Sequence, residues 1–284
     1  MMTHRLFFAI LTVFSSTAVI AQQATPKPDD NAALRYWSAF AQMQDSNVTP
    51  EQVKGLQAIL DGTAPYSDVN YRDLVERNRR AVETLQRGAT LSRCDWGVEY
   101  QLGTEAPVDY VRRALTLGRL NVLYAYHQLS SRNRSGGMRT LAGGIRFSHD
   151  VAGGGTLIAG VAAKVLMIAH LRAVDFAART QPLSSEEKTL LAAQLDQVGP
   201  EGVDWYSTMQ REFEVLERSG AKIPATLVEL YGKTVQDAAQ LPRLQQAMAG
   251  APQSVAGLIP RPQRVLEQKQ ELNDRLQQCR AMLR

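Results

Sequence analysis

The fold is decided by residues 108–180, whose apolar segments read VDYVRRALTLGRLNVLYAYHQL (108–129), MRTLAGGIRFSH (138–149) and LIAGVAAKVLMIAHL (157–171). In each segment the large apolar side chains recur mostly at spacings of three and four residues, which is the period of an amphipathic helix. Turn-forming residues separate the segments at 130–137 and 153–155. The pattern predicts three or four consecutive helices joined by short glycine turns, with Thr156 as the N-cap of the third.

Helices that follow one another through short turns can stack as antiparallel hairpins, the building unit of an α-solenoid. Ala125, Gly137 and Gly144 are small and Leu141 is large. This order of small and large side chains resembles the pattern of a tetratricopeptide repeat. The resemblance covers roughly 35 residues within 108–150, and Asn121 and Gln128 stand where that repeat carries aromatic side chains. It implies a helical-repeat scaffold that holds partners. We expect an all-α fold of stacked antiparallel helical hairpins, either a TPR-like α-solenoid or an irregular helical bundle.

The N-terminus has the pattern of a bacterial-type export signal. Arg5 precedes an apolar run over residues 6–20, and the residues up to Ala21 suit a signal peptidase. The run is short for a permanent membrane span, which disfavours the alternative of an uncleaved anchor helix. We expect a signal peptide at 1–21 with cleavage after Ala21, and a flexible linker at 22–31. The processed chain would be periplasmic or secreted, without a stable transmembrane span.

The chain has the composition of an ordinary globular protein, with 44% hydrophobic and 21% charged residues. Two capping boxes mark the starts of further helices, Thr49 with Gln52 and Ser184 with Glu187. Glycines and prolines lie mostly between the periodic segments, as expected for helices joined by turns. We predict a single all-helical domain over 32–284 whose core is 108–180.

Seven arginines, and no lysine or acid, occur between residues 110 and 149: Arg112, Arg113, Arg119, Arg132, Arg134, Arg139 and Arg146. Guanidinium groups form paired hydrogen bonds with carboxylates and phosphates. We interpret these arginines as candidate binding residues for a protein or an acidic partner in the cell envelope. The alternative is that they form ion pairs with acids on neighbouring helices, such as Glu76 or Glu83. A net charge of +4 is too small to indicate a nucleic-acid-binding protein.

A second candidate site is the segment 94–100, which reads CDWGVEY and places two acids beside two aromatic rings. Aromatic faces stack on sugars, and carboxylates accept hydrogen bonds from hydroxyl groups. Asp95, Trp96 and Glu99 are therefore candidate binding residues. The alternative is a connector that closes the end of the helical stack with Trp96 and Tyr100.

The sequence carries no complete catalytic or cofactor motif. It lacks a G-x-S-x-G elbow, an H-E-x-x-H motif and a glycine-rich phosphate loop, so we predict no catalytic residue and no cofactor. His149 and Asp150 resemble a metal-binding doublet, but further histidines are missing from suitable positions and no metal is predicted. The two cysteines, Cys94 and Cys279, could form one disulfide, or Cys279 could serve as a small apolar residue.

These observations predict an exported helical-repeat interaction or scaffold protein with no evident catalytic site. The alternative is a periplasmic helical hydrolase that acts on cell-wall glycan through acids such as Asp95 and Glu99. A hydrolase needs a deep pocket in which acids converge, whereas a scaffold needs a broad groove of one charge sign. Residues 156–171 are apolar enough to raise membrane association as a third possibility, but Lys164 near their middle favours a buried core helix.

Overall fold

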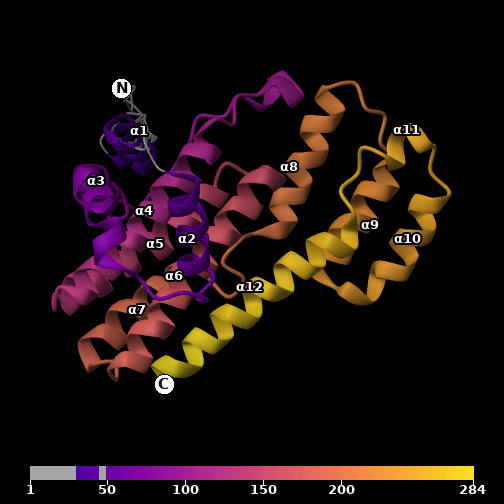
Figure 1. The fold of residues 1–284 in the computed structure, drawn as a ribbon. Coiled ribbons are helices and arrows are strands. Elements are labelled where there is room, and N and C mark those ends of the chain that lie inside the picture. Colours follow the sequence, from indigo (N-terminus) through magenta and orange to yellow (C-terminus); the bar gives the residue numbers. More distant parts are fainter. Residues whose placement is uncertain (1–29, 45–48) are drawn as a thin grey trace, which may run out of the picture.

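Helices and the short connections between them make up almost all of the described chain (Figure 1). The computed structural model describes residues 30–44 and 49–284, and within these it contains no strand beyond the single bridge pair of Asn31 and Arg93. The all-α prediction is confirmed. In chain order the α-helices and the 3-10 helices (η) are α1 (Ala32–Gln42), α2 (Pro50–Leu60), α3 (Asp68–Gly88), η2 (Tyr100–Glu105), α4 (Tyr110–Ser130), α5 (Arg134–Ala152), α6 (Leu157–Thr180), α7 (Ser185–Val198), α8 (Trp205–Arg218), α9 (Ala225–Gln236), η3 (Ala238–Gln240), α10 (Leu241–Ala249), α11 (Gln253–Ala256) and α12 (Pro262–Leu283).

Helices α4, α5 and α6 lie at the centre, with α5 packed against both of its neighbours in the chain. The predicted N-cap is present, because the Thr156 hydroxyl accepts a hydrogen bond from the amide of Ala159 at 3.4 Å. One predicted boundary is wrong: α5 begins at Arg134, so it includes the first pair of glycines instead of following them. The side-chain carbonyl of Asn133 accepts a hydrogen bond from the amide of Gly136 at 3.1 Å, and this cap starts the helix early.

Two glycines of α5 allow α4 and α6 to approach closely. A Cβ atom at Gly137 would lie 2.9 Å from Cγ of Leu129 in α4. A Cβ atom at Gly144 would lie 2.1 Å from Nε2 of His170 in α6 and 2.4 Å from Nδ2 of Asn121 in α4. Because these separations are shorter than van der Waals contact, the packing of the three helices requires glycine at both positions.

The outer helices close around this centre. Helix α1 packs against α3, α3 packs against α4 and α5, and α7 packs against α5. The C-terminal helix α12 crosses the front of the molecule diagonally and returns to α6 and α7, while α8 to α11 lie to one side (Figure 1). Helices from both ends of the chain, α1 and α12, thus pack on the central three.

Both predicted capping boxes are formed. Thr49 Oγ1 accepts from the amide of Gln52 at 3.2 Å, while the Gln52 side chain accepts from the amide of Thr49 at 3.0 Å. The corresponding bonds between Ser184 and Glu187 measure 3.2 Å and 2.9 Å. These reciprocal bonds satisfy amide groups that the first turns of α2 and α7 leave without helical partners.

Among the described residues, α6 is the one helix that is long and apolar enough to cross a membrane, by length and composition alone. Of its most apolar window, 72% is buried inside the protein. Lys164 in its middle is only 5% exposed and forms an ion pair with Glu271 of α12. The packing is therefore that of the core helix expected from the sequence, with Ile158 and Val165 on its exposed side.

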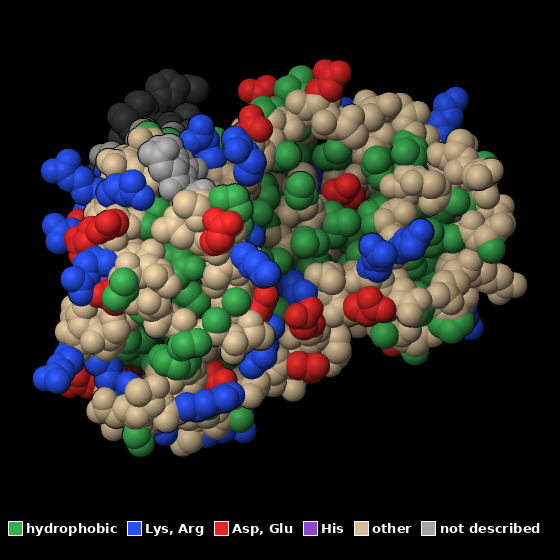
Figure 2. Space-filling model, in the orientation of Figure 1, with side chains coloured by type: hydrophobic (Ala, Val, Ile, Leu, Met, Phe, Trp, Pro, Cys, Tyr) green, Lys and Arg blue, Asp and Glu red, His purple; other side chains and the backbone are tan. Residues whose placement is uncertain are grey.

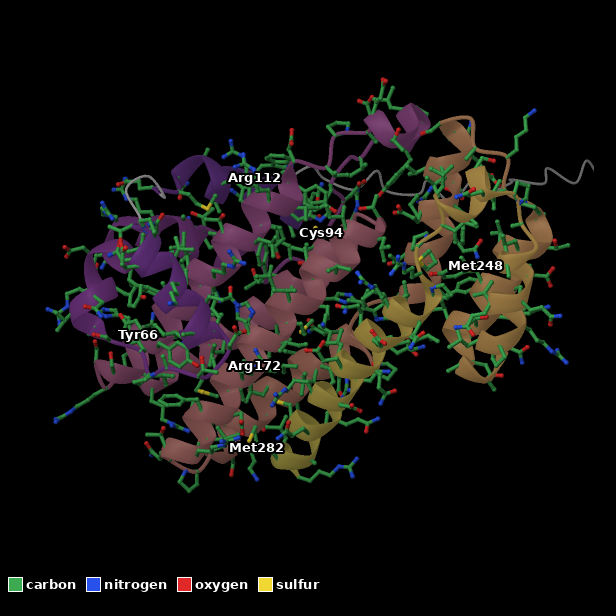
Figure 3. All side chains as sticks on the ribbon, turned by 45° about the vertical axis from the view of Figure 1, so that its right-hand side comes forward. Tyr66, Cys94, Arg112, Arg172, Met248 and Met282 are labelled. Carbon is green, nitrogen blue, oxygen red and sulfur yellow. The ribbon has the colours of Figure 1, made fainter. Side chains whose placement is uncertain are left out.

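Both cysteines lie in the described part of the chain and both are free, so the disulfide that the sequence left open is not formed. Cys94 lies in the segment before η2, whereas Cys279 belongs to the buried side of α12. Figure 3 shows Cys94 far from Met282, which is in the same helical turn as Cys279. A disulfide needs Cα atoms within about 7 Å of each other. Cys279 instead serves as a small buried apolar residue.

The predicted signal peptide and residues 22–29 of the predicted linker lie outside the described residues. The end of that linker is described, and there hydrogen bonds hold the side chain of Asn31. Its side chain accepts from the amides of Ala33 at 3.1 Å and Asp95 at 2.9 Å, and its amide group donates to the carbonyl of Asp95 at 2.9 Å. Asn31 is thus the N-cap of α1, and it ties that helix to the segment before η2.

Replacing Gly144 with alanine should lower the free energy of unfolding by about 2–3 kcal/mol, because the added methyl group would overlap His170 and Asn121. Gly250→Ala is the matched control, since Gly250 has a φ of −86° and the nearest atom to its added Cβ would lie 3.7 Å away. That variant should stay within about 1 kcal/mol of the parent. Urea unfolding followed by circular dichroism measures both, and equal stabilities would contradict the close packing.

Candidate functional site

Two adjoining hollows lie along α5 and share Ser92 and Arg146 in their linings. The first, of about 520 Å³, lies between the segment before η2, the end of α5 and the start of α8; we call it the tryptophan pocket after Trp96. The second, of about 830 Å³, lies between α3, α4, α5 and α7. We call it the amide groove because its lining includes Gln86, Gln128, Asn133, Gln194 and Gln197.

Trp96 is the centre of an aromatic cluster beneath the tryptophan pocket. Its ring stacks on Tyr110 with centroids 4.2 Å apart and on Phe40 at 6.0 Å. Its Nε1 donates a hydrogen bond to the backbone carbonyl of Asp150 at 2.7 Å. With 7% of its surface exposed, the indole packs mainly against the protein's own core. This is the arrangement of a connector that closes one end of the bundle, which was the alternative interpretation of the segment.

Asp150 is the most deeply buried acid of the tryptophan pocket. Its carboxylate accepts hydrogen bonds from the Tyr36 hydroxyl at 2.6 Å and from Nε of Arg146 at 2.9 Å. Burial raises the pKa of Asp150, and these two partners oppose the rise. Burial, with Asp150 nearby, also raises the pKa of Tyr36 and of Cys94. Neither group is therefore an activated nucleophile near neutral pH.

Three carboxylates line the tryptophan pocket, and groups of the protein itself bind each of them. Asp95 accepts from the amide of Gly97 at 3.0 Å. Asp204, the N-cap of α8, accepts from the amide of Ser207 at 2.9 Å and from its hydroxyl at 2.7 Å. Asp150 is held as described above. This pattern is typical of structural carboxylates, because a general acid or base must be available to its substrate.

Glu99 and His149 do not join a reactive cluster with these acids. Glu99 is exposed ahead of η2 and does not line the tryptophan pocket, so Asp95 and Glu99 do not converge on one cavity. His149 lines the pocket, but its Nδ1–H donates to the carbonyl of Gly202 at 2.9 Å. Across residues 30–44 and 49–284 no group of histidine, cysteine and acidic side chains is arranged to hold a metal ion.

The amide groove differs because two of its side-chain oxygens are buried without a hydrogen-bond partner among the described residues. They are Oε1 of Gln128 on α4 and Oε1 of Gln194 on α7. Leaving such an acceptor unsatisfied costs about 1–3 kcal/mol. Glycines of α5 make room for the glutamines: a Cβ at Gly136 would lie 2.1 Å from Oε1 of Gln128, and one at Gly143 would lie 2.1 Å from Oε1 of Gln86.

A buried hydrogen-bond network lies behind the groove and fixes Gln86. Nε2 of Gln86 donates to Oδ1 of Asn121 at 2.7 Å, and Nδ2 of Asn121 donates to the carbonyl of Thr140 and to Nε2 of His170, both at 3.0 Å. Nδ1 of His170 donates to the carbonyl of Leu166 at 2.7 Å. These contacts require a neutral histidine, because Nε2 acts as an acceptor. Burial accordingly lowers the pKa of His170 to about 4.

The seven arginines singled out in the sequence do not share one surface. Two of them line the amide groove, Arg139 and Arg146, and the second also lines the tryptophan pocket with Asp95 and Trp96. Arg112 and Arg113 are on the exposed side of α4, and Arg132 is on the turn before α5. Arg134 forms an ion pair between α5 and α7, and Arg119 lies beside α6 and α12.

Ion pairing, the alternative interpretation of the arginines, accounts for two of them. Nε of Arg134 lies 2.8 Å from Oε1 of Glu187, and Arg146 binds the buried carboxylate described above. Their partners are not the acids that the sequence suggested, since Glu76 and Glu83 make contacts with other residues of α3 and α4. The structure therefore brings only some of the predicted binding residues to the two hollows: Asp95, Trp96 and Arg146 to the tryptophan pocket, and Arg139 and Arg146 to the amide groove.

The glutamines of the groove were missed as site residues. A signal for one of them is present: Asn121 and Gln128 interrupt the apolar face of α4 seven residues apart, which is about two turns of helix. Amides at such positions must find partners inside the protein or in a ligand. Gln194 gives no such signal. It stands between Ala193 and Leu195, and a single polar residue there fits the exposed side of α7 as well as its buried side.

Lowering the pH from 7 to 4 should reduce the free energy of unfolding by about 3 kcal/mol through His170. The unfolded chain takes up a proton on this histidine below a pH of about 6.5, whereas the folded chain keeps it neutral down to about 4. Protons therefore favour the unfolded state, and stability falls as the pH falls through this window. Urea unfolding at a series of pH values measures the slope.

The variant His170→Asn serves as the reference for this slope. Asparagine does not titrate, so the part of the pH dependence that belongs to position 170 should disappear, whatever the stability of the variant at pH 7. If His170→Asn keeps the parental slope between pH 6.5 and 4, the conclusion that His170 is buried in its neutral form is wrong.

No known protein family, curated protein or solved structure gives a match to this chain. The resemblance to tetratricopeptide repeats accordingly stays a prediction from the sequence. A fold by itself does not determine a function, so the side chains of the two hollows have to indicate what the protein binds.

Proposed function

We propose that this chain is an exported binding protein that holds an extended, acidic segment of a partner protein in the amide groove. The observation that carries the proposal is that Gln128 and Gln194, which line the groove from α4 and α7, each keep a buried side-chain oxygen without a hydrogen-bond partner in the described chain. Once the two side-chain amides turn toward the groove, a ligand with N–H groups would supply the donors that these oxygens lack. The export signal that the sequence predicts supports a partner in the cell envelope.

An extended polypeptide suits these acceptors better than a sugar chain does. Its backbone alternates N–H donors and C=O acceptors, and the side-chain amide of glutamine or asparagine offers both in one group. Five such amides line the groove. Sugar-binding sites use aromatic rings for stacking. Of the described residues that line the groove, Tyr124 alone provides one.

The charges of the groove favour an acidic segment. Two arginines, Arg139 and Arg146, line it against one acid, Glu83, which leaves one excess positive charge. Arg146 is already bound to Asp150, so Arg139 is the arginine that an acidic side chain of the partner would meet. Arg139 is exposed, and an exposed ion pair contributes about 1 kcal/mol or less. It would select among partners more than it would tighten binding.

The alternative, a hydrolase of cell-wall glycan, draws its support from the carboxylates of the tryptophan pocket. Glycoside hydrolysis uses one carboxyl group as a proton donor and a second as a base or nucleophile, and both must reach the scissile bond. In this pocket Asp95, Asp150 and Asp204 all accept hydrogen bonds from the protein. Glu99 lies outside it. We therefore favour binding over catalysis.

A phage-displayed library of random peptides, selected on the purified chain, should enrich acidic sequences. The double variant Gln128→Leu with Gln194→Leu should bind the enriched peptides at least about tenfold more weakly in isothermal titration calorimetry, because leucine cannot accept their N–H groups. Without peptide, the same variant should be more stable than the parent by about 1–2 kcal/mol, because two unsatisfied buried acceptors have been removed. Urea unfolding measures this gain.

Gln270→Leu, an exposed glutamine on α12, is the matched control and should bind the peptides as the parent does. If no peptide is enriched, or if the double variant binds as tightly as the parent, the groove is not the binding site. Release of reducing ends from peptidoglycan by the parent chain would instead support the hydrolase.

A further inference from the structure

A third hollow lies on the opposite side of α4 from the amide groove. It measures about 190 Å³ and lies where α2, α4, α6 and α12 meet. Gln128 lines the groove and Arg119 lines the hollow. The two are nine positions apart, which is about two and a half helical turns, so they lie on opposite sides of α4. Basic and acidic side chains lie close together on the face in Figure 2, between α2 and α12. We call this site the cationic hollow.

Three cations and two acids line the cationic hollow, which leaves one excess positive charge. Lys164, which is 5% exposed, forms an ion pair with Glu271. Arg172 forms another with Asp61, with 3.1 Å between Nη1 and Oδ1. Both acids are thus engaged, and Arg119 is the cation that carries the excess charge.

The protein does not satisfy the guanidinium of Arg119. Its Nε is buried and has no hydrogen-bond partner in the part of the chain that is described. A buried donor on a charged group is destabilising when it is unpaired. Lys164 and Arg172 line the same small volume and add repulsion between like charges. An anion bound between these side chains would offset the unpaired charge of Arg119.

We propose that the cationic hollow binds the carboxylate of a small organic acid, with Arg119 as its main contact. A carboxylate brings one negative charge for one excess positive charge, and its two oxygens match the fork of a guanidinium group. A phosphate dianion would bring a second negative charge close to Asp61 and Glu271. The volume of about 190 Å³ also accommodates a short hydrocarbon tail against an apolar wall of Leu166, Ile168 and Ala169.

Isothermal titration calorimetry with sodium butyrate at constant ionic strength tests this site. The parent should show saturable binding at one site per chain. Arg119→Gln should weaken that binding by at least about tenfold, because it removes the charge and the fork. Arg119→Lys keeps the charge without the fork and should give an intermediate affinity. Arg119→Gln should also raise the melting temperature in butyrate-free buffer by about 1–2 °C, because an unsatisfied charge is lost.

Arg112→Gln is the matched control, because Arg112 is an exposed arginine on the same helix and Figure 3 shows it well apart from Arg172. It should leave both the butyrate affinity and the melting temperature unchanged. No saturable binding by the parent, or equal binding by Arg119→Gln, would overturn the proposal. Binding of inorganic phosphate that depends on Arg119, without binding of butyrate, would overturn the choice of a carboxylate.

The amide groove and the cationic hollow can fail independently, because they share no lining residue. Should Arg119→Gln fold poorly by circular dichroism, Arg119→Lys decides the question. Parental affinity in that variant would show that the fork of Arg119 does not hold the carboxylate.

Discussion

The close approach of α4 and α6 to α5 is the constraint on which the rest of the structure depends. At Gly137 and Gly144 the neighbouring helices come so near that one methyl group would overlap them. The same approach brings Asn121 within 3.0 Å of His170 across the centre of the bundle. It also fixes α4, which presents one side to the amide groove and the other to the cationic hollow. Both candidate sites take their geometry from this one packing arrangement.

The helical fold could be predicted from the sequence because a helix is a local structure. Spacings of three and four residues mark the buried sides, and the capping boxes at Thr49 and Ser184 mark helix starts. The start of α5 could not be predicted in this way, since the side chain of Asn133 overrides the glycine pair that follows it. Ion pairs between distant helices could not be predicted either, because their partners are far apart in the sequence. Arg134 and Glu187, for example, are 53 residues apart.

The candidate site was predicted in part, where the chemistry of a single residue suffices. Arginine suits an acidic partner wherever it stands, and Arg139 and Arg146 do line the groove. Whether a polar group lacks a partner depends on burial in the folded chain, which explains why Gln128 was not identified. Trp96 was identified as a candidate binding residue, but in the folded chain its ring stacks on Tyr110 and belongs to the core.

The ion pair between Lys164 and Glu271 has a consequence for the order in which this protein completes its fold. The two residues are 107 positions apart in sequence, and the acid lies in the last helix of the chain. Until α12 arrives, the apolar core helix α6 carries an ammonium group whose burial is strongly unfavourable. The side of α6 that carries Lys164 is therefore completed only when α12 packs on it, and this step joins residues far apart in the sequence, which form contacts more slowly than a single helix does.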